Sequence, residues 1–145
     1  METDRNDPLL LENQLCFPLY ACAREIVKRY KPHLDDIGLT YTQYVTMMVL
    51  WEKPEVTSKE IGERLHLDSG TLTPVIKKLA EKGLVTRGRD EVDERNLIVE
   101  LTDDGRALRA KAEGIPARVG ACIPLTADEA AKLYGILYKL LNGLA

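Results

Sequence analysis

Three cysteine thiols, Cys16, Cys22 and Cys122, are the side chains of this 145-residue sequence best suited to covalent chemistry. An odd number of cysteines at wide spacing argues against the disulfide framework of a secreted protein and favours reduced thiols in the cytoplasm. The two histidines, His33 and His66, cluster with no cysteine, so a structural zinc site is not expected. The sequence predicts no metal and no cofactor.

Cys16 has the sequence context that best favours a reactive thiolate. Pro18 suits the first turn of a helix, which would place Cys16 at the helix N-terminus, where the helix dipole stabilises an anion. If the helix instead began at Leu9 or Leu10, Pro18 would kink it and change the surroundings of the thiol. A cysteine on an apolar helix face is more often inert packing, which is how we interpret Cys22.

The composition is that of an ordinary globular protein. Hydrophobic residues make up 45% of the chain and charged residues 30%, which is typical of a soluble domain. No apolar run approaches the roughly 20 residues that span a bilayer, and the polar, acidic N-terminus is unlike a signal or transit peptide. We therefore expect a cytoplasmic protein with a single domain over residues 1–145 and no membrane partner.

Helical periodicity and capping signals predict six helices and one β-hairpin in the order ααααββαα. Three capping boxes begin helices, at Thr40 with Gln43, Thr57 with Glu60 and Thr126 with Glu129. Ser69 is the expected N-cap of another helix, and Gly83 is its C′ residue. The first helix ends before Pro32, and a long one covers 103–122 with a bend near Gly114. Strands at 84–89 and 97–102 complete a fold that is mainly α with a small β-hairpin.

The third and fourth predicted helices, the short turn between them and the following hairpin are expected to form a winged helix-turn-helix from about Thr57 to Thr102. With the preceding helix, the module spans about residues 40–102. Helical spacing turns the apolar side chains of the fourth helix inward and leaves the opposite face small and polar. That face would contact base edges and phosphates of DNA through Ser69, Gly70, Thr71, Thr73, Lys77 and Lys78. Pro74 lies within this helix, which either kinks there, as we favour, or begins later with Thr73 as its cap.

A local excess of positive charge accompanies this module, although the whole chain has a net charge of −3. From Lys77 to Arg89, five basic side chains stand against one acidic side chain, which gives a local charge of +4. Contact with DNA phosphates requires such a basic stripe. Arg87 and Arg89 of the predicted hairpin are therefore candidate DNA-binding residues.

The connection between the two strands holds a further candidate DNA contact. Asp93 and Arg95 are two residues apart, so extended backbone would point both side chains to the same side. The carboxylate would then orient the guanidinium for entry into a minor groove, which attracts arginine when it is narrow. The alternative is an exposed ion pair worth about 0–1 kcal/mol, and the preceding helix-turn-helix favours the DNA contact.

The first helix and the last two helices, at about 9–32 and 103–144, are not needed for the winged module. Their apolar stripes require partners, so we assign them to a homodimer interface that would place two DNA-binding modules on a pseudo-palindromic operator. The alternative is that these helices complete the core of a monomer.

Four segments carry a resemblance to a known family: LENQLCF at 11–17, LTYTQY at 39–44, LDSGTLTP at 67–74, and Asp93-Glu94-Arg95. They resemble the MarR family of transcription regulators, and within it the organic hydroperoxide resistance regulators. The resemblance covers nearly the whole chain. It implies a dimeric winged-helix repressor, not an enzyme, that is switched by oxidation of one cysteine.

By position, the resemblance implies that Cys16 is the redox sensor and that Tyr30 and Tyr41 of the partner subunit hydrogen-bond its thiol. Phenol hydroxyls that donate to a sulfur anion would stabilise the thiolate. Cys122 matches the resolving thiol of the two-cysteine type, which forms an intersubunit disulfide with the sensor. The alternative is that Cys122 is passive and an external thiol reacts instead. Pro18 departs from the small or apolar residues usual at this position.

These observations lead to one hypothesis and two alternatives. The reduced dimer binds a double-stranded operator, represses a peroxide-detoxifying gene, and leaves the DNA when an organic hydroperoxide oxidises Cys16 to a sulfenic acid. One alternative is a repressor gated by a non-covalent small aromatic ligand, in which the cysteines are bystanders. The other, a thiol peroxidase, has no supporting motif in the sequence.

Overall fold

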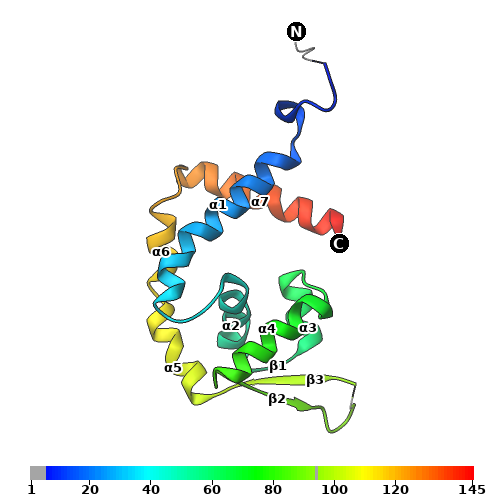
Figure 1. Cartoon of the computed structure of the whole chain (residues 1–145), viewed down its shortest axis with the longest axis vertical. Coiled ribbons are helices and arrows are strands. Elements are labelled where there is room, and N and C mark those ends of the chain that lie inside the picture. Colours follow the sequence, from blue (N-terminus) through cyan, green and yellow to red (C-terminus); the bar gives the residue numbers. More distant parts are fainter. Residues whose placement is uncertain (1–5, 94) are drawn as a thin grey trace.

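The computed structural model describes residues 6–93 and 95–145, and within these ranges most of the chain is helical (Figure 1). In chain order the elements are the 3₁₀ turn η1 (Leu11–Asn13), α1 (Cys16–Asp35), α2 (Tyr41–Glu52), β1 (Glu55–Thr57), α3 (Ser58–Leu65), α4 (Ser69–Glu81), β2 (Val85–Arg89), β3 (Leu97–Leu101), α5 (Asp103–Ala112), α6 (Ile115–Gly120) and α7 (Ala127–Leu144). The predicted fold class, mainly α with a small β element, is confirmed. Among the described helices, none is long and apolar enough to cross a membrane.

The core lies in a lobe formed by α2, α3, α4 and the sheet, which sits below the crossing of α1 and α7 in Figure 1. α2 is buried in the middle of this lobe, as its apolar surface predicted. α5 and α6 connect the lobe to the upper helices along one side. The fully buried side chains of the lobe and of α6 include Met47, Leu50, Ile61, Ile76, Leu79, Val99, Ile115 and Val119.

The sheet has three strands in the order β1-β3-β2, and both strand pairs are antiparallel. The sequence predicted β2 and β3 but not β1, which pairs Val56 with Val99. β1 has only three residues and pairs with a strand from beyond α3 and α4, so no local alternation marks it. Its one apolar side chain, Val56, is buried, and this burial holds the strand against the lobe.

α1 continues through Pro32, so the predicted end of this helix before the proline is wrong. A proline within a helix removes one backbone hydrogen bond. The following turn nevertheless buries Leu34, which is 1% exposed, and this burial offsets part of the cost of the lost bond. At the other end, Pro18 lies in the first turn and Cys16 is the first helical residue, as predicted. The alternative of an earlier helix start is thereby excluded.

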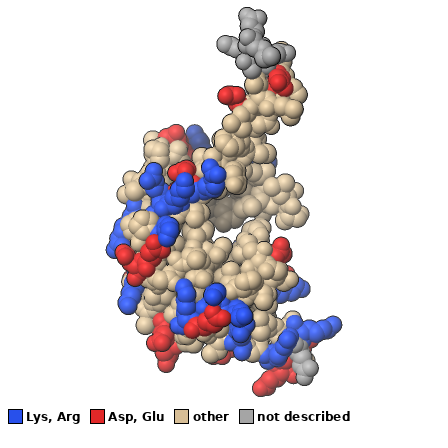
Figure 2. Space-filling model, in the orientation of Figure 1, with Lys and Arg blue, Asp and Glu red and all other residues tan. Residues whose placement is uncertain are grey.

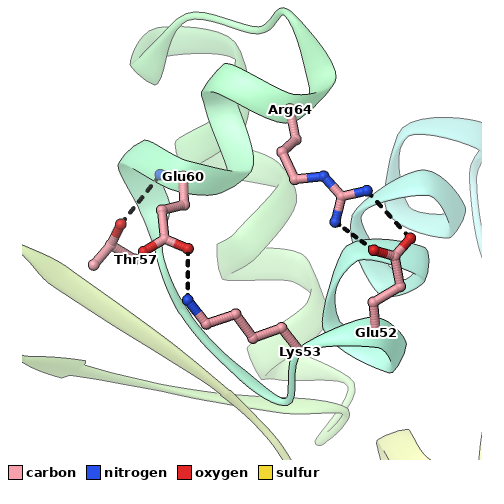
Figure 3. Close-up of polar contacts among 5 residues, drawn as sticks. All are labelled: Glu52, Lys53, Thr57, Glu60 and Arg64. Atoms are coloured by element: carbon pink, nitrogen blue, oxygen red, sulfur yellow. Dashed lines mark hydrogen bonds and ion pairs between the residues drawn. The ribbon is translucent and has the colours of Figure 1, made fainter.

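Two predicted capping boxes are complete, at Thr40 with Gln43 and at Thr126 with Glu129. The third is replaced by a different arrangement at the start of α3 (Figure 3). Thr57 Oγ1 accepts the Glu60 backbone N–H at 3.1 Å, but the Glu60 carboxylate pairs with Lys53 Nζ at 3.1 Å. The Glu60 side chain therefore links α3 to the end of α2 instead of capping its own helix.

The segment after the sheet forms two helices, whereas the sequence predicted one bent helix that reaches Cys122. α5 ends at Ala112 and α6 begins at Ile115, so the bend expected near Gly114 is a break. Pro116 lies in the first turn of α6, where a missing N–H costs no helical hydrogen bond. Cys122 consequently lies in the turn between α6 and α7.

Gly105, in the first turn of α5, is buried and has no room for a side chain. A Cβ at this position would lie 2.2 Å from the Leu84 carbonyl oxygen and 2.7 Å from Leu101 Cδ1. The Gly105 carbonyl also accepts the Trp51 indole N–H at 2.9 Å, which ties α5 to α2. We predict that Gly105→Ala lowers the free energy of unfolding by about 2 kcal/mol or more, because backbone must move to admit the methyl group.

Chemical denaturation at a fixed protein concentration measures this loss. Gly120→Ala is the matched control, because a Cβ at Gly120 would enter open space. Its free energy of unfolding should stay within about 0.5 kcal/mol of wild type. A Gly105→Ala variant as stable as the control would contradict the close packing of α5 on Leu84.

Candidate DNA-binding surface and thiol site

Local hydrogen bonds fix both ends of α4, the helix predicted to contact bases. Its N-cap is Asp68, not the predicted Ser69: Asp68 Oδ1 accepts the Thr71 backbone N–H at 2.7 Å. This bond holds the pKa of the Asp68 carboxyl below its ordinary value. Both residues are common caps, and the bond to the third helical residue decides in favour of Asp68. At the other end, Gly83 has the left-handed φ of +74° predicted for a C′ glycine.

α4 separates a buried face from an exposed face, as predicted. Leu72, Ile76 and Leu79 are at most 2% exposed. The opposite face is exposed and carries Ser69, Gly70, Thr71, Thr73, Lys77 and Lys78. Because α4 begins at Ser69 and continues through Pro74, the alternative start with Thr73 as cap is wrong. Pro74 is exposed, so water can solvate the carbonyl that loses its helical bond. A kink at Pro74 stays a prediction.

Two ion pairs link α3, the first helix of the helix-turn-helix, to the end of α2 (Figure 3). Arg64 makes a two-point contact with the Glu52 carboxylate, at 2.7 and 3.2 Å. This guanidinium lowers the pKa of Glu52. α3 ends at Leu65, and its C-cap residue His66, with a left-handed φ of 54°, turns the chain toward α4.

The wing between β2 and β3 places Asp93 and Arg95 in direct contact. Arg95 Nε lies 3.1 Å from Asp93 Oδ1, which also accepts the Arg95 backbone N–H at 3.1 Å. The hydrogen bond from Arg95 lowers the pKa of the Asp93 carboxyl. The Arg95 side chain is 91% exposed, so the carboxylate orients a guanidinium that still faces outward. Glu94, which completes the matching motif, lies outside the described residues.

Arg87 and Arg89 share one face of β2, because residues two apart in a strand point the same way. Arg87 is paired with Val99, whose buried side chain marks the face that packs on the helices. Both arginines lie farther along the strand than Val85, the buried residue of β2, and are exposed. Figure 2 shows basic side chains on the lobe and the wing, with acidic ones between them. Basic side chains also lie on the upper helices, so the local excess of positive charge stays a prediction from the sequence.

The three thiols lie at separate positions and all are exposed. Cys16 begins α1, and Cys122 follows α6, where its Sγ donates to the Arg118 carbonyl at 3.6 Å. Cys22 is also exposed, so the packing expected for it does not occur within a single chain. If these thiols are shielded from solvent, another molecule must cover them.

Tyr30 of α1 and Tyr41 and Tyr44 of α2 form an aromatic cluster where these helices meet. The ring centroid of Tyr30 lies 5.0 Å from that of Tyr41 and 5.8 Å from that of Tyr44. Burial raises the pKa of all three phenols. Their hydroxyls therefore stay protonated at neutral pH and can donate hydrogen bonds. The sequence analysis singled out Tyr30 and Tyr41 but missed Tyr44, which its position one helical turn after Tyr41 could have indicated.

Within one chain, Cys16 does not reach this tyrosine cluster. Cys16 and Tyr30 lie 14 residues apart on one continuous helix. With a rise of 1.5 Å per residue, they are about 21 Å apart along its axis. The phenols can therefore donate hydrogen bonds to a Cys16 thiol only if that thiol belongs to a second subunit.

α1 and α7 expose large apolar side chains that the rest of the described chain does not cover. On α1, Tyr20 is 59% exposed, and on α7, Ile136 is 63% exposed. Contiguous apolar surface of this kind marks an interaction site. The exposed apolar residues of the two helices include Phe17, Leu19, Tyr20, Ile26, Val27, Leu133, Tyr134, Ile136, Tyr138, Leu140, Leu141 and Leu144.

Comparisons with known proteins agree with this architecture. The family model for the transcriptional regulators SarA/Rot matches residues 28–111, which is more than half of the chain. The organic hydroperoxide resistance transcriptional regulator of Bacillus subtilis is 46% identical over 138 residues, covering 95% of this chain and 94% of the relative. These proteins are transcriptional regulators and not enzymes, as the sequence predicted.

Solved structures extend the similarity to three dimensions. AbfR of Staphylococcus epidermidis is 37% identical, with 92% of each chain covered and a TM-score of 0.72. The structure of reduced AbfR bound to DNA is 36% identical with a TM-score of 0.77, again with 92% of each chain covered. A mutant of MarR from E. coli, complexed with operator DNA, is 25% identical with a TM-score of 0.75, covering 88% of this chain and 93% of that one. The chain therefore belongs to the MarR family of winged-helix transcriptional regulators, and within it to the organic hydroperoxide resistance type.

Proposed function

We propose that this regulator is a homodimeric repressor that leaves its operator when an organic hydroperoxide oxidises Cys16. The separation between Cys16 and Tyr30 on α1 carries the proposal, because thiol and phenols can form one site only between two subunits. The uncovered apolar faces of α1 and α7 supply a surface for such a dimer, within the regions 9–32 and 103–144. The repressor would act in the cytoplasm, where its thiols stay reduced until a peroxide arrives.

In the reduced dimer, two copies of α4 would enter successive major grooves of a pseudo-palindromic DNA duplex, about 34 Å apart. The exposed first turns of α4, from Ser69 to Thr73, would contact base edges, and Lys77 and Lys78 would contact phosphates. Thr73 donates its hydroxyl to the Ser69 carbonyl at 2.6 Å, which leaves its methyl group for a thymine methyl. The wing would place Arg95 in the adjacent minor groove. Arg87 and Arg89 would add phosphate contacts.

The organic hydroperoxide would react with Cys16 in one nucleophilic displacement. The thiolate sulfur attacks a peroxide oxygen, the O–O bond breaks, and the alkoxide leaves and takes up a proton as an alcohol. Cys16 becomes a sulfenic acid by this two-electron oxidation. Tyr30 and Tyr41 of the partner subunit would donate hydrogen bonds to the thiolate, since burial keeps these phenols protonated.

Condensation of the sulfenic acid with Cys122 of the partner subunit would form a disulfide and release water. Cys122 suits this role because it is exposed in the turn between two helices and not buried in either. The relatives support redox control. One is a regulator of organic hydroperoxide resistance, and AbfR has been solved in overoxidised, reduced and disulfide forms.

A second candidate signal is a small aromatic ligand that binds without covalent change. A cavity of 220 Å³ lies between α2 and α5–α6, lined by Tyr44, Met48, Trp51 and Arg109 among others. PcaV of Streptomyces coelicolor, which is 25% identical, was solved in complex with its natural ligand. Release of DNA by a small aromatic acid under reducing conditions would favour this candidate.

We predict that cumene hydroperoxide lowers the operator affinity of the wild-type protein at least tenfold and leaves the affinity of Cys16→Ser unchanged. Fluorescence anisotropy with an operator duplex selected in vitro measures both. Cys22→Ser is the matched control, because Cys22 is an exposed thiol of the same helix and should leave the response intact. Release of Cys16→Ser by the peroxide would show that the sensor is elsewhere.

The Cys122→Ser variant distinguishes a two-cysteine switch, in which Cys122 resolves the sulfenic acid, from a switch in which an external thiol reacts instead. In a two-cysteine switch, the oxidised wild-type protein forms a covalent dimer on a non-reducing gel and Cys122→Ser does not. A covalent dimer that persists in Cys122→Ser would exclude Cys122 as the resolving thiol.

We predict that Arg95→Ala weakens operator binding roughly tenfold or more, because the guanidinium loses its groove contact. Arg106→Ala, which removes an exposed arginine of α5 outside both DNA-contacting elements, should bind like wild type. Asp93→Asn tests the orienting role: affinity should fall, since the carboxylate holds Arg95 in place. If Asp93→Asn binds the operator more tightly, the carboxylate does not orient Arg95 and acts only by repelling DNA.

A further inference from the structure

Lys82, the C-cap residue of α4, does not extend toward the DNA-facing side as the basic stripe suggested. Its Nζ donates to the Gly38 carbonyl and to Gln43 Oε1, the latter at 3.0 Å. These acceptors lie 44 and 39 residues earlier in the chain, in the α1–α2 turn and the first turn of α2. One ammonium group therefore joins the end of α4 to the junction of α1 and α2.

Both acceptors are themselves held in place. Gly38 has a φ of +70° and closes the turn after α1, where the Leu39 N–H returns to the Leu34 carbonyl. Gln43 is 7% exposed, and its Oε1 also accepts the Thr40 N–H at 3.0 Å as part of the capping box. The amide oxygen thus accepts two hydrogen bonds in a fixed orientation. Lys82 binds a rigid site and not a mobile surface group.

Because this contact lies at one end of α4, it can affect the position of the opposite, DNA-facing end of the helix. Thr71, in the first turn of α4, lies 11 residues before Lys82, which is about 17 Å along the helix axis. Hydrogen bonds from a charged donor are stronger than neutral ones, and here the contact with Gln43 is partly buried. A small rotation at the anchored end would displace Thr71 and Thr73 relative to the bases.

We propose that Lys82 is a positioning residue for operator binding: its contact with Gly38 and Gln43 sets the angle at which α4 meets DNA. Lys82 then acts from the side of α4 that faces the body of the protein and touches no phosphate. Tyr41 lies in the same first turn of α2 as Gln43, so the contact also connects the tyrosine cluster to α4. This last step, from sensor to α4, rests on the proposed redox function.

Operator affinity and its salt dependence together test the proposal on the reduced full-length protein. Lys82→Met keeps the aliphatic stem and the helix propensity and removes only the ammonium group. It should weaken binding about tenfold without changing the slope of log Kd against log salt concentration. Lys82→Arg can still donate to both oxygens and should restore most of the affinity. Lys77→Met on the same helix is the comparison, since loss of a phosphate contact should reduce that slope by about one.

Wild-type affinity in Lys82→Met would overturn the proposal, and so would a slope reduced by about one, which would make Lys82 a phosphate contact. Loss of the fold, seen by circular dichroism, would make Lys82 a stability residue and would overturn it equally.

A double-mutant cycle with Gln43→Glu provides an independent test. A glutamate at this position can keep the capping box and gives Lys82 a charged acceptor. Lys82→Met should therefore cost more affinity in the Gln43→Glu background than in wild type, whereas additive effects would exclude the contact.

The link to the sensor has its own measurement, the ratio of Kd after oxidation to Kd before it. This ratio should fall toward one in Lys82→Met if oxidation acts through the contact. An unchanged ratio would mean that Lys82 affects operator binding but does not transmit the oxidation of Cys16. A wild-type protein that fails to respond to hydroperoxide would refute the redox function, while the tests on the reduced protein would still decide the role of Lys82.

Discussion

The continuity of α1 is the constraint on which the account of this regulator depends. Because the helix runs unbroken from Cys16 to Asp35, its first thiol and its tyrosine Tyr30 stay about 21 Å apart in every state that preserves the helix. No side-chain rotation can close that distance. The same helix carries an uncovered apolar face, and so does α7. Under the proposed function, association of two subunits would bury these faces and offer each thiol a set of phenol donors, so one event would complete both the interface and the sensor.

The DNA-binding end depends on local polar contacts that position exposed groups without burying them. Asp68 fixes the start of α4, Arg64 holds α3 to the end of α2, and Asp93 orients Arg95 in the wing. Exposed ion pairs contribute little to stability individually, with typical values of about 0–1 kcal/mol. In the proposed operator complex their value would lie in geometry, because binding to two grooves at once would require side chains that are already oriented.

Local signals in the sequence predicted the parts of this structure that local chemistry controls. The capping boxes of α2 and α7, the C′ glycine after α4 and the two faces of α4 depend on residues within a few positions of each other. The predictions from the sequence were wrong where contacts between distant parts of the chain determine the local structure. β1 forms because Val56 pairs with a strand from beyond α4, and α1 passes Pro32 because Leu34 is buried by the lobe. The contacts of Lys82 could not be predicted from the sequence for the same reason, since both of its acceptors lie in another part of the chain.

Mixed dimers test most directly whether the sensor forms between subunits. One subunit carries Cys16→Ser and keeps its tyrosines, and the other carries Tyr30→Phe with Tyr41→Phe and keeps its cysteine. If the site forms between subunits, the mixed dimer has one complete site, and cumene hydroperoxide should convert its single Cys16 to sulfenic acid at the wild-type rate. Oxidation as slow as in the homodimer that lacks both phenol hydroxyls would contradict the account.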